Sequence, residues 1–115
     1  MIKINLVEYF ENTVRKHADK IAVYDKERDI TFSGLEQKCK LLASEILSRK
    51  NVIKRPIAIY LNKSIESVYS DLAVIYSGNF YMNLDVKTPV TRIKNILELV
   101  CPEVIITNNQ FEKNI

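Results

Sequence analysis

Side chains able to do covalent or acid–base chemistry are few in this sequence. It contains one histidine, two cysteines and two glycines. His17, Cys39 and Cys101 stand far apart, and no spacing joins them to further metal ligands or to a nucleophile–base pair. We therefore assign no catalytic, cofactor-binding or metal-ligating residue in this chain.

The shortage of glycine excludes the common phosphate-binding loops. Such loops need clustered glycines, so that backbone N–H groups can crowd around the anion. Gly34 and Gly78 are far apart, and neither the dinucleotide fingerprint nor the P-loop pattern can be built from them. Two turns that run from a predicted strand into a predicted helix, residues 62–64 and 85–89, contain no glycine. A dinucleotide or P-loop site is excluded within this chain.

Structural roles account for the remaining reactive side chains. His17 falls in the last turn of a predicted helix, where a packed or helix-terminal histidine is expected rather than a catalytic base. Cys39 lies on an apolar helix face and should be a buried thiol. Cys101 precedes Pro102 at a helix end and should be partly exposed. Three tyrosines in predicted strands are expected to be core or rim residues with hydrogen-bonded hydroxyls: Tyr24, Tyr60 and Tyr81.

Composition places the chain among soluble, folded proteins. Hydrophobic residues make up 47% and charged residues 27%, and a net charge of +3 is too small to indicate nucleic acid. The basic stretch at residues 49–55 has no interleaved aromatic residue, so we expect a solvated helix end there. No apolar run approaches the ~20 residues of a membrane span. With no signal peptide and no cysteine pair, a cytoplasmic location is expected.

The first part of the chain predicts a helix followed by a β-hairpin. Asn5 suits the N-cap of a helix whose apolar residues recur at helical spacing. Residues 21–25 and 29–32 then have the composition of short strands, joined by the polar residues 26–28. A second helix should open at Ser33, with Glu36 completing a capping box.

From residue 56 onward the sequence alternates strands and helices. Residues 56–61, 80–84 and 104–107 are the predicted strands, and the first of them is apolar throughout, as in a parallel sheet covered on both faces. Ser64 caps one intervening helix and Gly78 ends it, while Pro89 suits the first turn of the other. The predicted fold class is therefore α/β: a helix, a β-hairpin, then β-α-β-α-β with a mostly parallel sheet flanked by helices.

Residues 78–93 form the most specific stretch. Gly78 should turn the chain from helix to strand, and Asp85 should accept hydrogen bonds from free N–H groups of the turn that follows. Arg92 can reach back to Asp85 or out to another segment. Caps and an ion pair explain these residue types better than direct ligand contacts do.

The same stretch resembles the second core motif of the adenylate-forming (AMP-binding) ligases, L-K-A-G-x-A-Y-V-P-I-D-P-x-x-P-x-x-R-I. Phe80 replaces a small residue of this pattern, and Asn83 and Val86 replace two prolines. The positions that match in register are Gly78, Tyr81, Asp85, Pro89, Arg92 and Ile93.

A second motif lies upstream in the expected order. Residues 30–35 resemble the first core motif, L-T-Y-x-E-L, with Thr31 and Leu35 matching and Gly34 in place of the usual glutamate. Residues 19–23 resemble the family's "P-D-K-I-A-V". The likeness covers about residues 5–107 and is closest to amino-acid adenylation domains of nonribosomal peptide synthetases and to D-alanine–carrier protein ligases.

The resemblance implies that the chain is part of a larger enzyme. Residues 1–108 would be the N-terminal segment of an adenylation domain, folded as a partial N-terminal subdomain, and residues 109–115 a polar tail at a truncation point. In this family both motifs are mainly structural, so the matching residues are expected to form the scaffold. The family's phosphate loop, adenine-binding segment, ribose-binding aspartate and catalytic lysine lie downstream.

The parent enzyme implied by the resemblance uses ATP and magnesium. It would activate a carboxylate, an amino acid rather than a fatty acid, as acyl-AMP. It would then pass the acyl group to a thiol, either the phosphopantetheine of a carrier protein or CoA. The remainder of the ligase chain is the implied partner of this segment. The segment alone is expected to be inactive and to bind no cofactor.

An alternative from another class is a stand-alone α/β interaction or docking module without catalysis. A half-domain with both sheet faces built for burial can leave apolar surface exposed and self-associate. The reading frame separates the two hypotheses. Coding sequence that continues past Ile115 into a Ser/Thr/Gly-rich loop favours the ligase, and a natural stop codon there favours the module.

Overall fold

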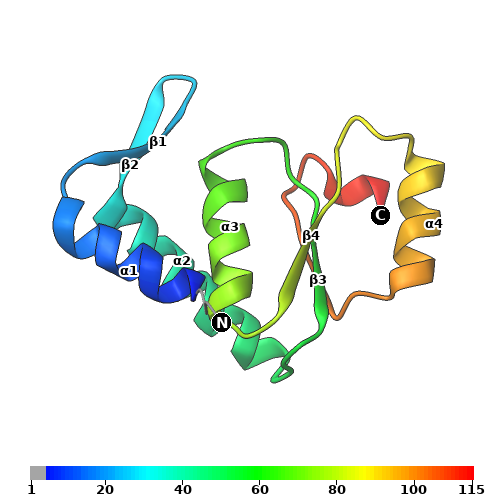
Figure 1. Cartoon of the computed structure of the whole chain (residues 1–115). Coiled ribbons are helices and arrows are strands. Elements are labelled where there is room, and N and C mark those ends of the chain that lie inside the picture. Colours follow the sequence, from blue (N-terminus) through cyan, green and yellow to red (C-terminus); the bar gives the residue numbers. More distant parts are fainter. Residues whose placement is uncertain (1–4) are drawn as a thin grey trace.

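The computed structural model describes residues 5–115 and confirms the predicted α/β class (Figure 1). Its helices alternate with short strands in the predicted order. The helices are α1 (Leu6–His17), α2 (Phe32–Arg49), α3 (Ile65–Tyr76), α4 (Val90–Val100) and the short 3-10 helix η1 (Glu112–Asn114). The strands are β1 (Ile21–Asp25), β2 (Arg28–Thr31), β3 (Pro56–Ile59), β4 (Phe80–Asn83) and β5 (Val104–Ile106).

The strands form two separate sheets. β1 and β2 form the predicted antiparallel hairpin, with an irregularity between Ile21 and Val23. The other three strands form a parallel sheet in the order β4-β3-β5, in which Ile57 of β3 lies opposite Tyr81 on one side and Val104 on the other. The chain therefore steps from β3 outward to β4, then crosses back past β3 to reach β5.

This reversal places α3 and α4 on opposite faces of the parallel sheet, because crossover connections keep one hand (Figure 1). Successive residues of β3 point to opposite faces and so enter different cores. Ile57 and Ile59 pack in the core that α2 and α3 cover, whereas Ala58, together with Tyr60 just beyond the strand, packs toward α4. The unbroken apolar run of β3 is thus explained by burial on both sides.

Side-chain caps define two of the helix starts as predicted. The Asn5 side chain accepts hydrogen bonds from the N–H groups of Val7 at 3.0 Å and Glu8 at 3.3 Å. Ser64 caps α3, and Ser67 returns a hydrogen bond to the Ser64 backbone, which makes a full capping box. Both starts could be predicted because every group involved lies within one helical turn.

The predicted start of α2 was wrong. The N-cap is Thr31, whose hydroxyl accepts a hydrogen bond from the Gly34 N–H at 3.1 Å, and the helix begins at Phe32. Ser33 therefore lies inside the helix. Glu36 does not close a capping box, and its carboxylate lies 3.6 Å from the Lys40 ammonium. The N-cap of α2 therefore lies two residues upstream of the predicted one.

Glycine and proline mark the boundaries of α3 and α4 close to the predicted positions. Gly78 follows α3 with a φ of +82°, a left-handed conformation that favours glycine. Pro89 stands one residue before α4 as its N-cap, so the expectation that it lies in the first turn was off by one position. Cys101 ends α4 with a φ of +50°, and Pro102 follows it.

The polar segment at the end of the chain packs on the α4 side of the sheet. Phe111 meets the Tyr60 ring edge-on, with ring centroids 5.8 Å apart. The Asn114 amide donates a hydrogen bond to the Tyr60 hydroxyl at 3.3 Å. Two side chains of residues 109–115 therefore contact Tyr60, and the boundary at residue 108 stays a prediction.

Candidate functional site

The crevice in the position most typical of a ligand site lies beyond the carboxyl ends of β3 and β4. These neighbouring strands lead into helices on opposite faces, and ligands of open α/β sheets bind at such a switch point. A hollow of about 590 Å³ opens there. It is lined by residues 61–63 after β3, by residues 83–87 at and just after the end of β4, and by two side chains of α3, Ser67 and Asp71.

Asp71 is the most unusual polar group in this crevice. One of its carboxylate oxygens is buried and has no hydrogen-bond partner among residues 5–115. Burial raises the pKa of Asp71, while the Asn83 side chain acts in the opposite sense. The unpartnered Asp71 oxygen could accept a hydrogen bond from a ligand. Asp71 and Asn83 together form the polar centre of the crevice.

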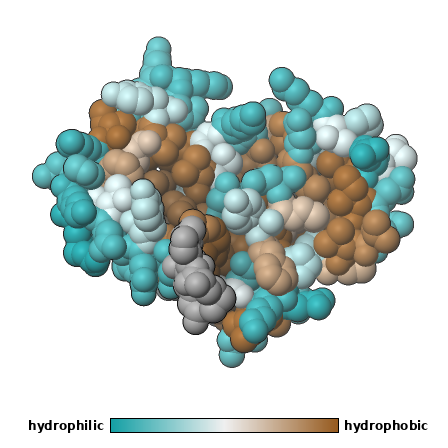
Figure 2. All heavy atoms as spheres, viewed as in Figure 1, coloured by the Kyte–Doolittle hydropathy of each residue, from teal (hydrophilic) through white to brown (hydrophobic). Residues whose placement is uncertain are grey.

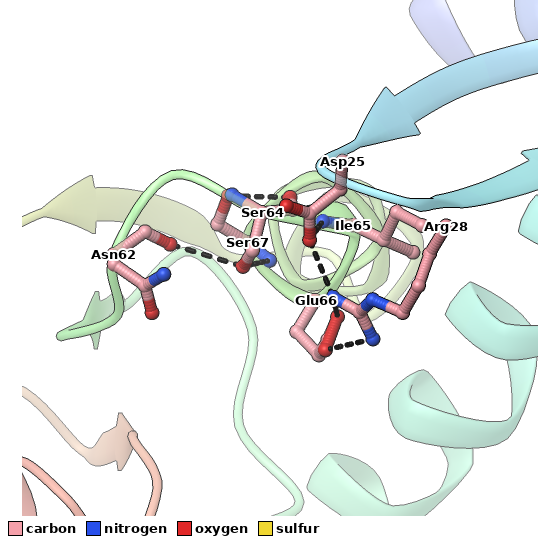
Figure 3. A network of polar contacts seen from close by, with 7 residues as sticks. All are labelled: Asp25, Arg28, Asn62, Ser64, Ile65, Glu66 and Ser67. Carbon is pink, nitrogen blue, oxygen red and sulfur yellow. Dashed lines mark hydrogen bonds and ion pairs between the residues drawn. The ribbon is translucent and has the colours of Figure 1, made fainter.

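The N-terminus of α3 is tied to the β-hairpin (Figure 3). The Asp25 carboxylate accepts a hydrogen bond from the Ile65 N–H at 3.2 Å. Arg28 pairs with Asp25 and also with Glu66, where its Nη1 lies 2.8 Å from Oε1. The Ile65 N–H and the Arg28 guanidinium hold the pKa of Asp25 below its usual value. We call these three charged residues, Asp25, Arg28 and Glu66, the hairpin clamp.

Carboxylates of the chain itself occupy both strand-to-helix turns of the crevice. At the turn after β3, the Asp25 carboxylate accepts a hydrogen bond from the Ile65 N–H, and the Ser64 hydroxyl accepts one from the Ser67 N–H at 3.2 Å. At the turn after β4, Asp85 accepts from the Lys87 N–H at 2.9 Å. A phosphate would compete with these side chains for the N–H groups, whereas the ammonium groups of Lys63 and Lys87, which also line the crevice, would attract it.

The described residues also lack a cluster of metal-binding side chains. Within residues 5–115, no group of three or more histidine, cysteine, aspartate or glutamate residues could hold a metal ion. The same part of the chain contains no helix that is both long and apolar enough to cross a membrane.

The motif residues singled out from the sequence do not converge on one site. Thr31 caps α2, and Leu35 is buried one turn later. Gly78 and Tyr81 lie at the other end of β4 from the crevice, and Tyr81 is 45% exposed. Only Asp85 lines the crevice itself, where it caps the turn as expected.

The remaining motif residues belong to α4. Pro89 occupies the N-cap position without a side-chain hydrogen bond, and Ile93 is buried against Ala58, Tyr60 and Leu84. Arg92 is exposed, and the described residues contain no ion pair between it and Asp85. A scaffold role for the eight motif residues remains our prediction.

The other candidate side chains lie as follows. Cys39 is buried and Cys101 is exposed, both as expected. His17 is the last residue of α1 and is exposed, so the helix-terminal alternative holds. Tyr60 is buried with a hydrogen-bonded hydroxyl, whereas Tyr24 is 74% exposed and is not a core residue.

Sequence reasoning missed the hairpin clamp and the hollow beside it. The hollow, about 660 Å³, lies between the hairpin, α2, α3 and the ends of β3 and β5, and the clamp residues form part of its lining. Residues 25, 28 and 66 have no local pattern in common. One signal was present in the sequence: Asp25 ends a strand and Arg28 follows it by three residues.

Comparison with known proteins gives peptide synthetases as relatives. A chain of N-(5-amino-5-carboxypentanoyl)-L-cysteinyl-D-valine synthase from Penicillium rubens is 32% identical over 100 residues, 87% of this chain and 3% of the relative. Tyrocidine synthase 1 from Brevibacillus parabrevis is 27% identical over 100 residues, 87% of this chain and 9% of the relative. The chain thus spans only a small part of these curated relatives.

Solved structures of peptide synthetases share the fold. The nonribosomal peptide synthetase FmoA3, in its α-methyl-L-serine-AMP-bound form, superposes with a TM-score of 0.90 at 18% identity, over 97% of this chain and 13% of that one. Holo-PA1221, a protein with adenylation and PCP domains bound to a vinylsulfonamide inhibitor, gives a TM-score of 0.79 at 22% identity, over 87% of this chain and 17% of that one.

A family model described as "AMP-binding enzyme" matches residues 10–115. This match covers all the elements from the middle of α1 to the end of the chain. It confirms the resemblance to adenylate-forming ligases that the two core motifs indicated. The chain belongs to the AMP-binding enzyme family.

Proposed function

We propose that this chain is the N-terminal scaffold of a ligase that activates an amino acid. The parent enzyme would form an acyl-adenylate from ATP and an amino acid, and would then transfer the acyl group to a thiol. ATP and magnesium would be its cofactors, and they would bind outside residues 5–115. The observation that carries the proposal is the match of residues 10–115 to the AMP-binding enzymes together with the peptide-synthetase relatives.

The relatives favour an amino acid over a fatty acid and a carrier protein over CoA. Of the two curated relatives named above, one is a tyrocidine synthase and the other is a synthase whose name contains the amino acids cysteine and valine. A structural neighbour, PA1221, contains adenylation and PCP domains in one protein. A phosphopantetheine thiol on a carrier protein is therefore the acceptor we propose for the parent.

The chain's own contribution would be structural. Asp25 and Asp85 cap the two strand-to-helix turns and thereby hold the loops of the crevice in place. We propose that the chain alone does not catalyse adenylation, because the phosphate loop and catalytic lysine implied by the family would lie in the remainder of the ligase.

The activity is tested on the full-length parent by ATP–pyrophosphate exchange over a panel of amino acids and fatty acids. We expect exchange that depends on an amino acid. Exchange with fatty acids alone would contradict the proposed substrate class. Mass spectrometry of a co-expressed carrier protein, with CoA supplied as the competing thiol, then tests the acceptor: we expect the amino acid on phosphopantetheine.

A second candidate function is an interaction module without catalysis. The observation that favours it is an uncharged strand, β4, at an open edge of the parallel sheet. A parent reading frame without the downstream ligase segments, and a chain that associates through this edge, would support the module.

A further inference from the structure

We propose that β4 pairs antiparallel with β4 of a second copy of this chain, joining two parallel sheets into one across a twofold axis. This inference does not depend on the proposed ligase activity. It depends on the backbone geometry of the β4 edge, on the side chains there, and on a comparison with the opposite edge of the sheet.

The outer edge of β4 has free backbone groups. Its neighbour in the sheet is β3, and within residues 5–115 no strand pairs with its other side (Figure 1). The Phe80 N–H donates to the Arg55 carbonyl at 3.0 Å, and the Leu84 N–H donates to the Ile59 carbonyl at 2.9 Å. Alternate residues of a strand face opposite sides. Tyr81 and Asn83 therefore direct their N–H and C=O groups away from β3.

The side chains of β4 do not protect this edge. Natural edge strands avoid pairing by carrying charges, prolines or bulges. The sequence of β4, Phe-Tyr-Met-Asn, has no charge and no proline, and its register with β3 is regular. Phe80 is 58% exposed and Tyr81 45% exposed. In the ligase motif quoted above a proline stands where this chain has Asn83, so this chain has a backbone donor that the motif lacks.

The other edge of the sheet is better protected. β5 has three residues, one fewer than β4. Pro102 and Glu103 precede it directly, and the Glu103 carboxylate pairs with Arg55 at 3.1 Å. A proline and a charge at the entry to a strand are the usual obstacles to edge pairing. Pairing is therefore expected at β4 and not at β5.

A second copy matches the β4 edge because the pattern of donors and acceptors is self-complementary. If the twofold axis passes beside Met82, Tyr81 of each copy lies opposite Asn83 of the other. Residues opposed in this way exchange both N–H···O bonds. The two Met82 side chains then face each other as the close, non-hydrogen-bonded pair. A four-residue contact is small, so the association belongs to the weak, transient class.

Figure 2 shows hydrophobic residues at the surface of the viewed face, interspersed with hydrophilic ones. Phe80 and Tyr81 are among the large hydrophobic residues that remain exposed. Pairing through β4 would cover part of the exposed surface of Phe80 and Tyr81, which adds to the backbone hydrogen bonds.

Sedimentation equilibrium tests the proposal on the 115-residue chain, with Asn83→Pro as the blocking variant and Asn83→Ala as its control. Both substitutions remove the amide side chain, but only proline removes the outward N–H, and edge strands tolerate proline at such positions. Over about 1 µM to 1 mM protein, a range that covers weak association, we expect dimerisation of the wild type and of Asn83→Ala. Asn83→Pro should remain monomeric with an unchanged circular dichroism spectrum.

Amide hydrogen exchange on the wild type keeps the test decisive if Asn83→Pro does not fold. Protection of the Tyr81 and Asn83 amides should rise with protein concentration, whereas a protection that stays constant overturns the proposal. A wild type that is monomeric at every concentration overturns it too, as does a dimeric Asn83→Pro. Protection that appears only when the rest of the ligase is added in trans would assign the edge to that partner instead of to a second copy.

Discussion

The two cysteines occupy opposite environments. Cys39 is fully buried in the core between α2 and α3, and burial raises the pKa of its thiol to about 11. Cys101 is exposed at the end of α4. Since the thiolate is the reactive form and needs access to the reagent, the two side chains should differ strongly in reactivity.

We predict that one thiol of the native protein reacts quickly with a disulfide reagent at neutral pH. The other thiol should react only after denaturation. Cys101→Ser should remove the fast phase, and Cys39→Ala should leave it in place as the control. Two fast thiols in the native state would contradict the burial of Cys39.

Asp25 is the residue through which the hairpin reaches α3. Its pKa is lowered in the folded protein, so the folded state binds a proton at this carboxylate less readily than the unfolded chain does. The stabilisation is fully present above the usual aspartate pKa and is lost as the pH falls through the lowered value. Acid should therefore loosen the contact between the hairpin and α3.

We predict that Asp25→Asn lowers the urea midpoint at neutral pH relative to the wild type. The difference should shrink as the pH falls below about 4, the ordinary aspartate range. Asp29→Asn, on the exposed part of the same hairpin, is the matched control and should change the midpoint little. A difference between Asp25→Asn and the wild type that persists unchanged at low pH would count against the clamp.

Among the secondary-structure elements, the junction between α3 and β4 depends on the left-handed backbone conformation of Gly78. Gly78 has a φ of +82°, and its carbonyl accepts from the Lys54 N–H at 2.7 Å. A Cβ added there would lie 3.4 Å from Ile53 Cγ2, which is close to ordinary contact. The requirement for glycine therefore comes mainly from the left-handed backbone and much less from lack of space.

We predict that Gly78→Ala destabilises the protein by roughly 1–2 kcal/mol, the cost of a left-handed conformation for an ordinary residue. Gly78→Asn should lose less, because asparagine tolerates this conformation. Urea unfolding of the three proteins measures the order. Equal losses for alanine and asparagine would indicate a steric cause at Ile53.

Element types were predictable from the sequence where the deciding contacts are local. Asn5 and Ser64 bond to N–H groups within one turn of themselves, and Gly78 needs only its own φ. The start of α2 was missed because Thr31 and Ser33 are both competent caps, and the sequence pattern alone does not distinguish them. The hairpin clamp was not predictable, since Arg28 and Glu66 are 38 positions apart and meet only in the folded chain.

The crevice is a property of the whole molecule. Its place follows from the strand order β4-β3-β5, which the β-α-β-α-β alternation alone does not determine. Asp71 reaches the crevice from α3, the helix that follows β3. The sequence motifs indicated the family, and the cap at Asp85 was predicted, whereas the contact of Asp25 with the turn after β3 emerged only from the structure.

The most direct test of this account is isothermal titration of the 115-residue chain with ATP in the presence of magnesium. The account predicts no measurable binding, because Asp25 and Asp85 already occupy the turns that a phosphate would need. The full-length parent, titrated under the same conditions, is the positive control. Micromolar ATP binding by the 115-residue chain itself would contradict the account.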